Sequence, residues 1–317
     1  MKTASFPKRV EVYEVGPRDG LQNELRTLTT PAKAKLIEAL EAAGLKRIEV
    51  TSFVSPRWIP QLADAEKLLG LVKHTPDVHF TGLVPNLKGL ERAKSAGLRE
   101  AAVFLSVTES YSKKNINKSV AEAVATAREV AEGARAAGMQ VRCYLSTVWG
   151  CPYEGLVPVE RVVEVVKQLV DIGFYQLSLG DTIGVGTPGQ TEAIVEAVSK
   201  LVPLKNIALH LHDTRGTALA NALVGLSMGI TTFDSSIGGL GGCPYAPGAA
   251  GNLATEDLVY MLHGMGIETG VDLPKLVEAG ELAQELIGRK LTGKYLQAAL
   301  GEREKQSRGR QAEPVCG

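Results

Sequence analysis

An excess of charge of one sign, closely spaced cysteine pairs and long apolar runs are all missing from this chain of 317 residues. Lysine and arginine together number 35, as do aspartate and glutamate, so the net charge near neutral pH is about zero. A balanced charge gives no overall field that attracts nucleic acid or an anionic membrane. We therefore expect a small-molecule partner, with no nucleic-acid and no membrane partner.

The four cysteines, at positions 143, 151, 243 and 316, form no CxxC pair and no dense framework. This usage is typical of free thiols in a reducing compartment. Cys143 and Cys151 are interpreted as packing residues, and Cys316 is free to form an intermolecular disulfide if it is oxidised. No apolar run reaches the roughly 18 residues of a membrane-spanning helix, and no signal segment precedes the first strand-like residues. The sequence thus predicts a cytoplasmic protein.

What the chain does have is a repeated alternation of helix-like and strand-like segments. Five helix-like segments end in glycine, where a left-handed helix C-cap is expected, and a short strand-like run follows each one. These glycines are Gly44, Gly97, Gly138, Gly173 and Gly229. Eight strands are predicted in all, at residues 10–15, 47–51, 78–84, 100–107, 141–147, 175–179, 207–212 and 231–235. Strict alternation predicts parallel strands, and eight such units close into the α/β fold called a (β/α)8 or TIM barrel.

We expect residues 1–300 to form a single barrel domain, with extra amphipathic helices after about residue 270. Residues 301–317 are polar and lack periodicity, so a disordered tail is predicted there. Barrel closure places the eighth strand beside the first, and active sites of this architecture lie at the C-terminal ends of the strands. Catalytic and metal-binding residues are therefore expected at the C-terminal ends of the first, seventh and eighth strands.

The seventh predicted strand carries the strongest chemical signal, His210-Leu211-His212-Asp213. Residues two apart on a strand point to the same face, so the two imidazoles project side by side. Two buried packing histidines would give the same pattern. A metal site is favoured by the other residues expected at the same end of the barrel.

The first strand ends in Gly16-Pro17-Arg18-Asp19-Gly20, a turn that presents a cation and a carboxylate together. A surface turn is the alternative. Glu49 lies between two apolar residues on the second strand and is expected to point into the barrel toward a positive partner such as Arg18. A purely structural ion pair would account for it equally well.

After the eighth strand comes a glycine-rich segment with Cys243 at its tip, which suits a mobile loop that closes over a substrate. An inert thiol is the alternative for Cys243. Asn252 follows and is either a metal ligand or the N-cap of the next helix, with Glu256 one turn later. Asp19, His210, His212 and Asn252 together form a mixed nitrogen and oxygen site without thiolate, which favours Mg²⁺ or Mn²⁺ over Zn²⁺ or Fe²⁺.

Two further segments are interpreted without a catalytic role. Residues 184–189 match GxGxxG, but no carboxylate ends the next strand, so the glycines are expected to shape a turn beside Asp181 and not to bind a dinucleotide. Residues 113–118 form a basic loop after the fourth strand, which is either solvated or able to meet phosphates.

Several motifs resemble those of the 3-hydroxy-3-methylglutaryl-CoA lyases over residues 10–295. They are VGPRDGLQNE at 15–24, IEVTSFVSPRW at 48–58, PNLKG at 85–89, LSLGDTIGVGTPG at 177–189, HLHDT at 210–214 and SIGGLGGCPY at 236–245. The loop around Cys243 is the specific signature, since Arg18, Asp19 and the HxHD strand alone would indicate only a wider superfamily of metal-dependent barrel lyases, synthases and aldolases. Arg215, where an aromatic residue is expected, and Ile237-Gly238 in place of Val-Ala leave the preferred acyl chain length open.

The resemblance implies a divalent cation, Mg²⁺ or Mn²⁺, held by Asp19, His210, His212 and Asn252. It also implies catalytic roles for Arg18 and Cys243. For the general base, the chemistry of the reaction leaves Asp19 and His210 as the candidates. Supporting or substrate-contacting roles fall to Gln22, Glu49, Asp181 and Glu256.

The expected activity is cleavage of (S)-3-hydroxy-3-methylglutaryl-CoA to acetyl-CoA and acetoacetate, as in leucine or ketone-body metabolism. An acyl-CoA is then the substrate, and a homo-oligomer, preferably a dimer, is the expected assembly. The alternatives are a Claisen condensing enzyme that joins acetyl-CoA to a 2-oxo acid, of the isopropylmalate or homocitrate synthase type, and an inactive binding barrel.

Overall fold

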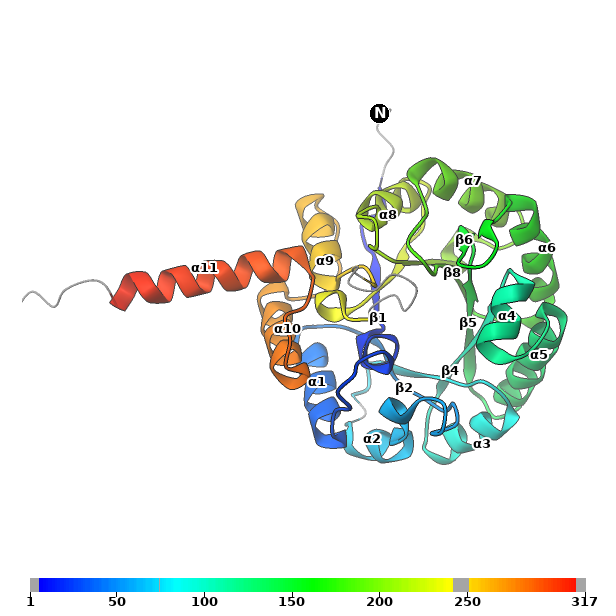
Figure 1. Ribbon diagram of the computed structural model, residues 1–317, viewed down its shortest axis with the longest axis horizontal. Coiled ribbons are helices and arrows are strands. Elements are labelled where there is room, and N and C mark those ends of the chain that lie inside the picture. The colour runs from blue at the N-terminus through cyan, green and yellow to red at the C-terminus, as the bar shows by residue number, and fades with distance from the viewer. Residues whose placement is uncertain (1–5, 74, 242–250, 312–317) are drawn as a thin grey trace, which may run out of the picture.

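The computed structural model describes residues 6–73, 75–241 and 251–311. Eight parallel strands close into one barrel in the order β1-β10-β9-β8-β5-β4-β3-β2, and helices surround it (Figure 1). The barrel strands are β1 Glu11–Glu14, β2 Arg47–Ser52, β3 His79–Leu83, β4 Glu100–Ser106, β5 Gln140–Ser146, β8 Gln176–Asp181, β9 Ile207–Leu211 and β10 Thr232–Ser235. The predicted TIM barrel and all eight predicted strands are confirmed.

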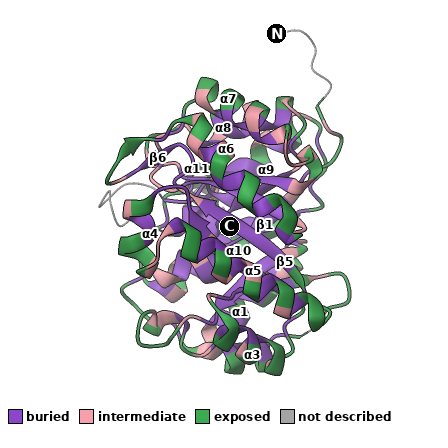
Figure 2. Cartoon of the chain, turned by 90° about the vertical axis from the view of Figure 1, so that its right-hand side faces the viewer, coloured by how far each residue is buried: buried purple, intermediate pink, exposed green. Residues whose placement is uncertain are grey.

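The helices that follow the barrel strands form its outer layer. They are α1 Thr30–Ala42, α2 Ala65–Leu71, α3 Leu87–Ser95, α4 Glu109–Ile116, α5 Val120–Ala136, α6 Val159–Leu169, α7 Pro188–Ser199, α8 Ala218–Ser227 and α9 Thr255–Gly264. Side-chain caps fix several of their starts; for example, Ser119 and Glu122 form a capping box at α5. Buried residues concentrate on the strands and on the inward helix faces (Figure 2).

Local chemistry explains where the helices stop. All five glycines predicted as C-caps adopt positive φ, between 71° at Gly138 and 99° at Gly229.

A short antiparallel hairpin, β6 Gly150–Cys151 with β7 Gly155–Leu156, follows β5 and was not predicted. Two residues per strand are too few to leave a periodic pattern in the sequence.

Two extra helices follow the barrel, α10 Leu273–Ile287 and α11 Lys294–Gln311. Figure 1 shows α11 projecting away from the barrel. The prediction of a disordered tail from residue 301 is wrong as far as Gln311, because α11 continues to that residue. Its second half has no apolar stripe, yet it is rich in strong helix formers, and Arg303 lies 3.5 Å from Glu281 of α10. Residues 312–317, including Cys316, lie outside the described residues.

Barrel closure brings the ends of the first, seventh and eighth barrel strands together, as predicted. β10 pairs with β1 on one side and with β9 on the other, so the C-terminal ends of these three strands adjoin. In the part of the chain that the structure describes, no helix is long and apolar enough to cross a membrane.

Two of the C-cap glycines provide a matched test of backbone packing. A Cβ on Gly44 would lie 2.3 Å from the carbonyl oxygen of Gly270, whereas a Cβ on Gly97 would meet no atom within 4 Å. We expect Gly97→Ala to lower the free energy of unfolding by about 1 kcal/mol, the cost of a left-handed alanine. Gly44→Ala should cost clearly more, because backbone must also shift. Equilibrium urea denaturation measures both, and equal losses would contradict this account.

Candidate active site

The turn at the end of β1 presents two of the predicted catalytic residues. Gly16–Gly20 forms a short π-helical turn, closed by a hydrogen bond of 3.3 Å from the Gly20 backbone N–H to the Val15 carbonyl oxygen. The buried carboxylate of Glu14 lies beneath the turn and accepts hydrogen bonds from the backbone N–H groups of Gly16 (2.7 Å) and Ile237 (2.9 Å). Glu14 thus ties this turn to the residues that follow β10.

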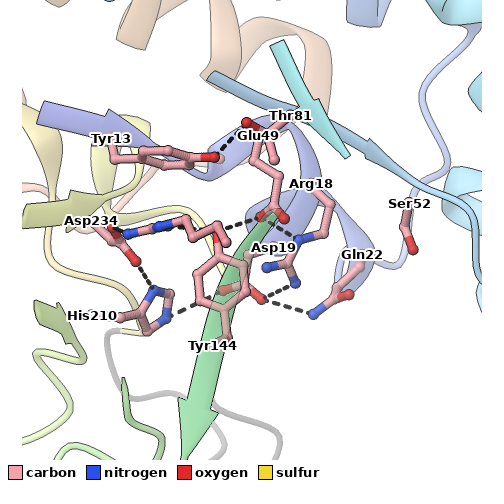
Figure 3. A network of polar contacts seen from close by, with 12 residues as sticks. Tyr13, Arg18, Asp19, Gln22, Glu49, Ser52, Thr81, Tyr144, His210 and Asp234 are labelled. Carbon is pink, nitrogen blue, oxygen red and sulfur yellow. Dashed lines mark hydrogen bonds and ion pairs between the residues drawn. The ribbon is translucent and has the colours of Figure 1, made fainter. Parts of the chain in front are cut away.

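Arg18 is held between two carboxylates, as Figure 3 shows. Its Nε donates to Glu49 Oε2 at 2.6 Å, and its Nη1 donates to Asp19 Oδ1 at 2.8 Å. Burial by itself lowers the pKa of Arg18, but the carboxylates of Glu49 and Asp19 outweigh burial and raise this pKa above its usual range. Glu49 therefore points into the barrel toward Arg18, as the sequence predicts, and Arg18 stays charged.

Asp19, His210 and His212 form a cluster that can hold a metal ion, because one ligand atom of each lies within 4.8 Å of the others. The two imidazole Nε2 atoms are 3.3 Å apart, and His210 Nε2 is 3.9 Å from Asp19 Oδ2. The buried Nδ1 of His212 has no hydrogen-bond partner among the described residues.

The charge states of this cluster suit a cation. Burial raises the pKa of Asp19, but Arg18 and the two imidazoles outweigh it and lower the pKa to about 2. Burial, together with His210, lowers the pKa of His212 to about 4. Near neutral pH the carboxylate is ionised and the His212 imidazole is neutral, which are the forms that bind metal.

Asn252 and Gln22 both contact the carboxylate of Asp19. Asn252 Nδ2 donates to Asp19 Oδ2 at 2.8 Å, and Gln22 Nε2 donates to Asp19 Oδ1 at 2.9 Å. Helix α9 begins only at Thr255, after its N-cap Ala254, so the alternative that Asn252 caps the helix is wrong. The Asn252 carboxamide thus lies beside the cluster with its nitrogen toward Asp19, and its role as an oxygen ligand stays a prediction.

Asp181 and Glu256 support backbone turns around the cluster. The two oxygens of Asp181 accept hydrogen bonds from the backbone N–H groups of Val185 (3.0 Å) and Gly186 (2.9 Å), so residues 184–189 shape a turn as predicted. Glu256 Oε2 accepts a hydrogen bond of 2.7 Å from Gly238 N–H, at the start of the glycine-rich segment. Cys243 lies outside the described residues.

Sequence reasoning missed a second group of charged and polar residues under the cluster. Asp234 accepts a hydrogen bond from Arg142 and lies 3.2 Å from Nδ1 of His210, and Tyr144 donates a hydrogen bond of 3.1 Å to Glu49. Burial raises the pKa of Asp234, but Arg142 and His210 together hold it below its usual range. Polar residues at alternating positions of β5, Arg142 and Tyr144, carry the same two-residue spacing as the histidines, and that signal was available.

A cavity of about 630 Å³ opens above these residues. Its inner lining includes Arg18, Asp19, Tyr144, His210 and His212, and its lining also includes the exposed Trp58 and Lys114. Residues 113–118 were expected to be a loop, but Lys113 to Ile116 form the last turn of α4, and Asn117 is its left-handed C-cap. The basic segment therefore lies on a helix beside the cavity.

Residues 9–283 match the model of the HMGL-like family. The chain belongs to this family. It is 52% identical over 294 residues to mitochondrial hydroxymethylglutaryl-CoA lyase of Bos taurus, covering 93% of this chain and 90% of the relative. Curated relatives named as mitochondrial and as cytoplasmic lyases both match.

Solved structures agree with this family. The crystal structure of the HMG-CoA lyase of Bacillus subtilis is similar with a TM-score of 0.91 and 50% identity, covering 92% of this chain and 98% of the other. An HMG-CoA lyase of Acinetobacter baumannii in complex with coenzyme A and 3-methylmalate is similar with a TM-score of 0.88 and 36% identity, covering 94% and 96%. The lyases of this family are carbon–carbon lyases, and the barrel and family predictions are confirmed.

The buried Glu256 gives a pH prediction. Burial raises its pKa from an ordinary value of 4.5 to about 8, and nearby carboxylates add to the rise. Between these values the folded protein holds a proton at Glu256 that the unfolded chain has lost, so this group makes stability fall as the pH rises. In Glu256→Gln nothing ionises at this position, and the free energy of unfolding should fall less steeply over this range.

Equilibrium urea denaturation of the wild type and Glu256→Gln at several pH values across this range provides the measurement. The control is Glu196→Gln, since Glu196 is an exposed carboxylate on α7 and its loss should leave the wild-type slope unchanged. If Glu256→Gln follows the same pH dependence as the wild type, Glu256 is already ionised in the folded protein.

Proposed function

We propose that this chain cleaves 3-hydroxy-3-methylglutaryl-CoA to acetyl-CoA and acetoacetate by a metal-assisted retro-Claisen reaction. The observation that carries the proposal is the cluster of Asp19, His210 and His212, which lies beside a buried and charged Arg18 on the lining of one cavity. Relatives named as hydroxymethylglutaryl-CoA lyases at about half identity over most of the chain support the same activity.

Asp19, His210, His212 and Asn252 would hold a divalent cation, and their mixed imidazole and oxygen donors suit Mg²⁺ or Mn²⁺. When bound, the cation supplies Lewis acidity that lowers the pKa of the substrate's 3-hydroxyl and orients it. Because two imidazole nitrogens and a carboxylate oxygen already face one another, little rearrangement of this chain is needed.

Removal of the hydroxyl proton requires a base close to the proposed cation site. Asp19 and His210 both line the cavity, and either one can accept this proton. Asp19 receives hydrogen bonds from Arg18, Gln22 and Asn252, which fix its orientation. These donors keep Asp19 ionised near neutral pH, so it can accept a proton, although the low pKa that they cause also makes it a weaker base.

The reaction also requires stabilisation of the negative charge that develops on the thioester oxygen as the carbon–carbon bond breaks, and Arg18 can provide it. Its guanidinium is held by Glu49 and Asp19, lies 5.3 Å from the centre of the Tyr144 ring and lines the cavity. A cation fixed before the substrate arrives stabilises charge without reorganising during the reaction. Cys243, as predicted from the sequence, then protonates the acetyl-CoA carbanion.

The cavity suits an acyl-CoA substrate. The exposed side chains on its lining include the cation Lys114 and the indole of Trp58, groups able to meet phosphate and an aromatic base. The similar Acinetobacter lyase was solved with coenzyme A. A homodimer and a cytoplasmic location stay predictions from the sequence.

A product assay tests the proposed function directly. Purified protein reconstituted with Mg²⁺ or Mn²⁺ should convert 3-hydroxy-3-methylglutaryl-CoA to equal amounts of acetyl-CoA and acetoacetate, detected by chromatography. Removal of the cation with a chelator should abolish turnover, and added Mn²⁺ should restore it, because the hydroxyl is no longer activated without the cation. Condensation of acetyl-CoA with a 2-oxo acid, without cleavage, would instead identify a synthase; no turnover with any substrate would indicate a binding barrel.

Replacement of Arg18 tests the electrostatic role. Arg18→Gln keeps hydrogen-bonding capacity but removes the charge, so kcat should fall by about 10²- to 10³-fold while KM changes little. The matched control is Arg303→Gln on α11, which removes an exposed guanidinium paired with Glu281 and should leave kcat unchanged. Steady-state kinetics provides both constants, and near-normal turnover of Arg18→Gln would exclude the role proposed for this residue.

A further inference from the structure

Beneath the metal-binding cluster, Asp234 contacts the only nitrogen of His210 that does not face the cluster. His210 Nδ1 lies 3.2 Å from Asp234 Oδ2, while Nε2 faces Asp19 (Figure 3). Nε2 also lies 3.3 Å from Nε2 of His212. Asp234 is itself buried, with an exposed fraction of 1%. A carboxylate bonded to one imidazole nitrogen fixes which nitrogen carries the proton.

The orientation of the Asp234 carboxylate is fixed from two further strands. Its Oδ1 accepts from Nη2 of Arg142 on β5, and its Oδ2 accepts a hydrogen bond of 2.7 Å from the hydroxyl of Ser178 on β8. Arg142 is fully buried, donates through Nε to Gln176 at 2.8 Å and lies over the ring of Tyr13 at 3.9 Å. The guanidinium can only donate hydrogen bonds, so the atom of residue 234 that faces it must be an acceptor.

We propose that Asp234, held by Arg142, is the positioning residue that keeps the proton of His210 on Nδ1 and leaves the Nε2 lone pair free to bind the cation. This inference deepens the proposed function, because it rests on the same metal site. Asp234 acts through His210 and touches no substrate.

The variant Asp234→Asn separates this role from simple packing. The asparagine oxygen must face the donors of Arg142, so its NH₂ group turns toward His210 Nδ1 and Ser178. His210 Nδ1 must then accept, the proton moves to Nε2, and the lone pair that would bind the cation is lost. The same exchange of tautomers accounts for the loss of about 10⁴-fold in kcat when the triad aspartate of a serine protease is replaced by asparagine.

Titration of the full-length protein with Mn²⁺, followed by electron paramagnetic resonance of the free ion, provides a readout that is independent of turnover. Asp234→Asn should bind Mn²⁺ about 10- to 100-fold more weakly than the wild type. The control is Thr81→Val, which breaks the buried hydrogen bond from Tyr13 to Thr81 in the same barrel interior but contacts neither Asp234 nor His210. This control should keep the wild-type affinity.

The outcomes separate the two proposals. If the wild type itself binds no Mn²⁺, the proposed metal site is wrong; if the wild type binds Mn²⁺ and folded Asp234→Asn binds it equally well, only the role of Asp234 is wrong. Should Asp234→Asn fail to fold, ¹⁵N-histidine correlation spectra of the wild type decide, with His210→Gln used to assign the signal. A proton on Nδ1 of His210 supports the proposal, and a proton on Nε2 overturns it.

Discussion

Opposed charges buried inside the barrel are the constraint on which the rest of the site depends. Arg18 is paired with Glu49 and Asp19, and Arg142 is paired with Asp234. Removing one member of a buried pair leaves its partner uncompensated, which typically costs about 3–5 kcal/mol. Hydrogen bonds connect the two groups of charges. Arg142 donates to Asp234 and to the hydroxyl of Tyr144, and Tyr144 donates to Glu49, which also accepts from Arg18. The charged side chains therefore act as a unit.

Barrel closure is what allows this unit to form. Asn252 and Asp19 are 233 residues apart in the chain, yet they share a hydrogen bond because β10 pairs with β1. Glu14 reinforces the same junction, since its carboxylate accepts hydrogen bonds from Gly16 at the end of β1, from Ile237 after β10 and from Thr255 at the start of α9. The fold thus contributes to the chemistry by bringing distant ligands together.

Much of this arrangement is predictable from local patterns. The period of two places His210 and His212 on one face, the C-cap glycines mark the strand starts, and the apolar neighbours of Glu49 indicate an inward carboxylate with a positive partner. The pairing of Arg142 with Asp234 is not predictable in this way, because the partners lie on strands that are not adjacent in sequence or in the sheet. The predicted tail failed for a different reason: helix formers without an apolar face were interpreted as disorder, although contacts with α10 support α11.

The balance of charge around the cluster also explains why these residues suit an anionic acyl-CoA. The carboxyl groups of Glu49, Asp19 and Asp234 face two guanidinium groups, those of Arg18 and Arg142, and the His212 imidazole is neutral near neutral pH. Carboxyl groups therefore outnumber guanidinium groups in this network, which favours a dication. A bound dication would offset the additional carboxyl group and would complement the carboxylate of the substrate or the enolate that forms during cleavage. Asp234 and Arg142 belong to this network although neither residue lines the cavity.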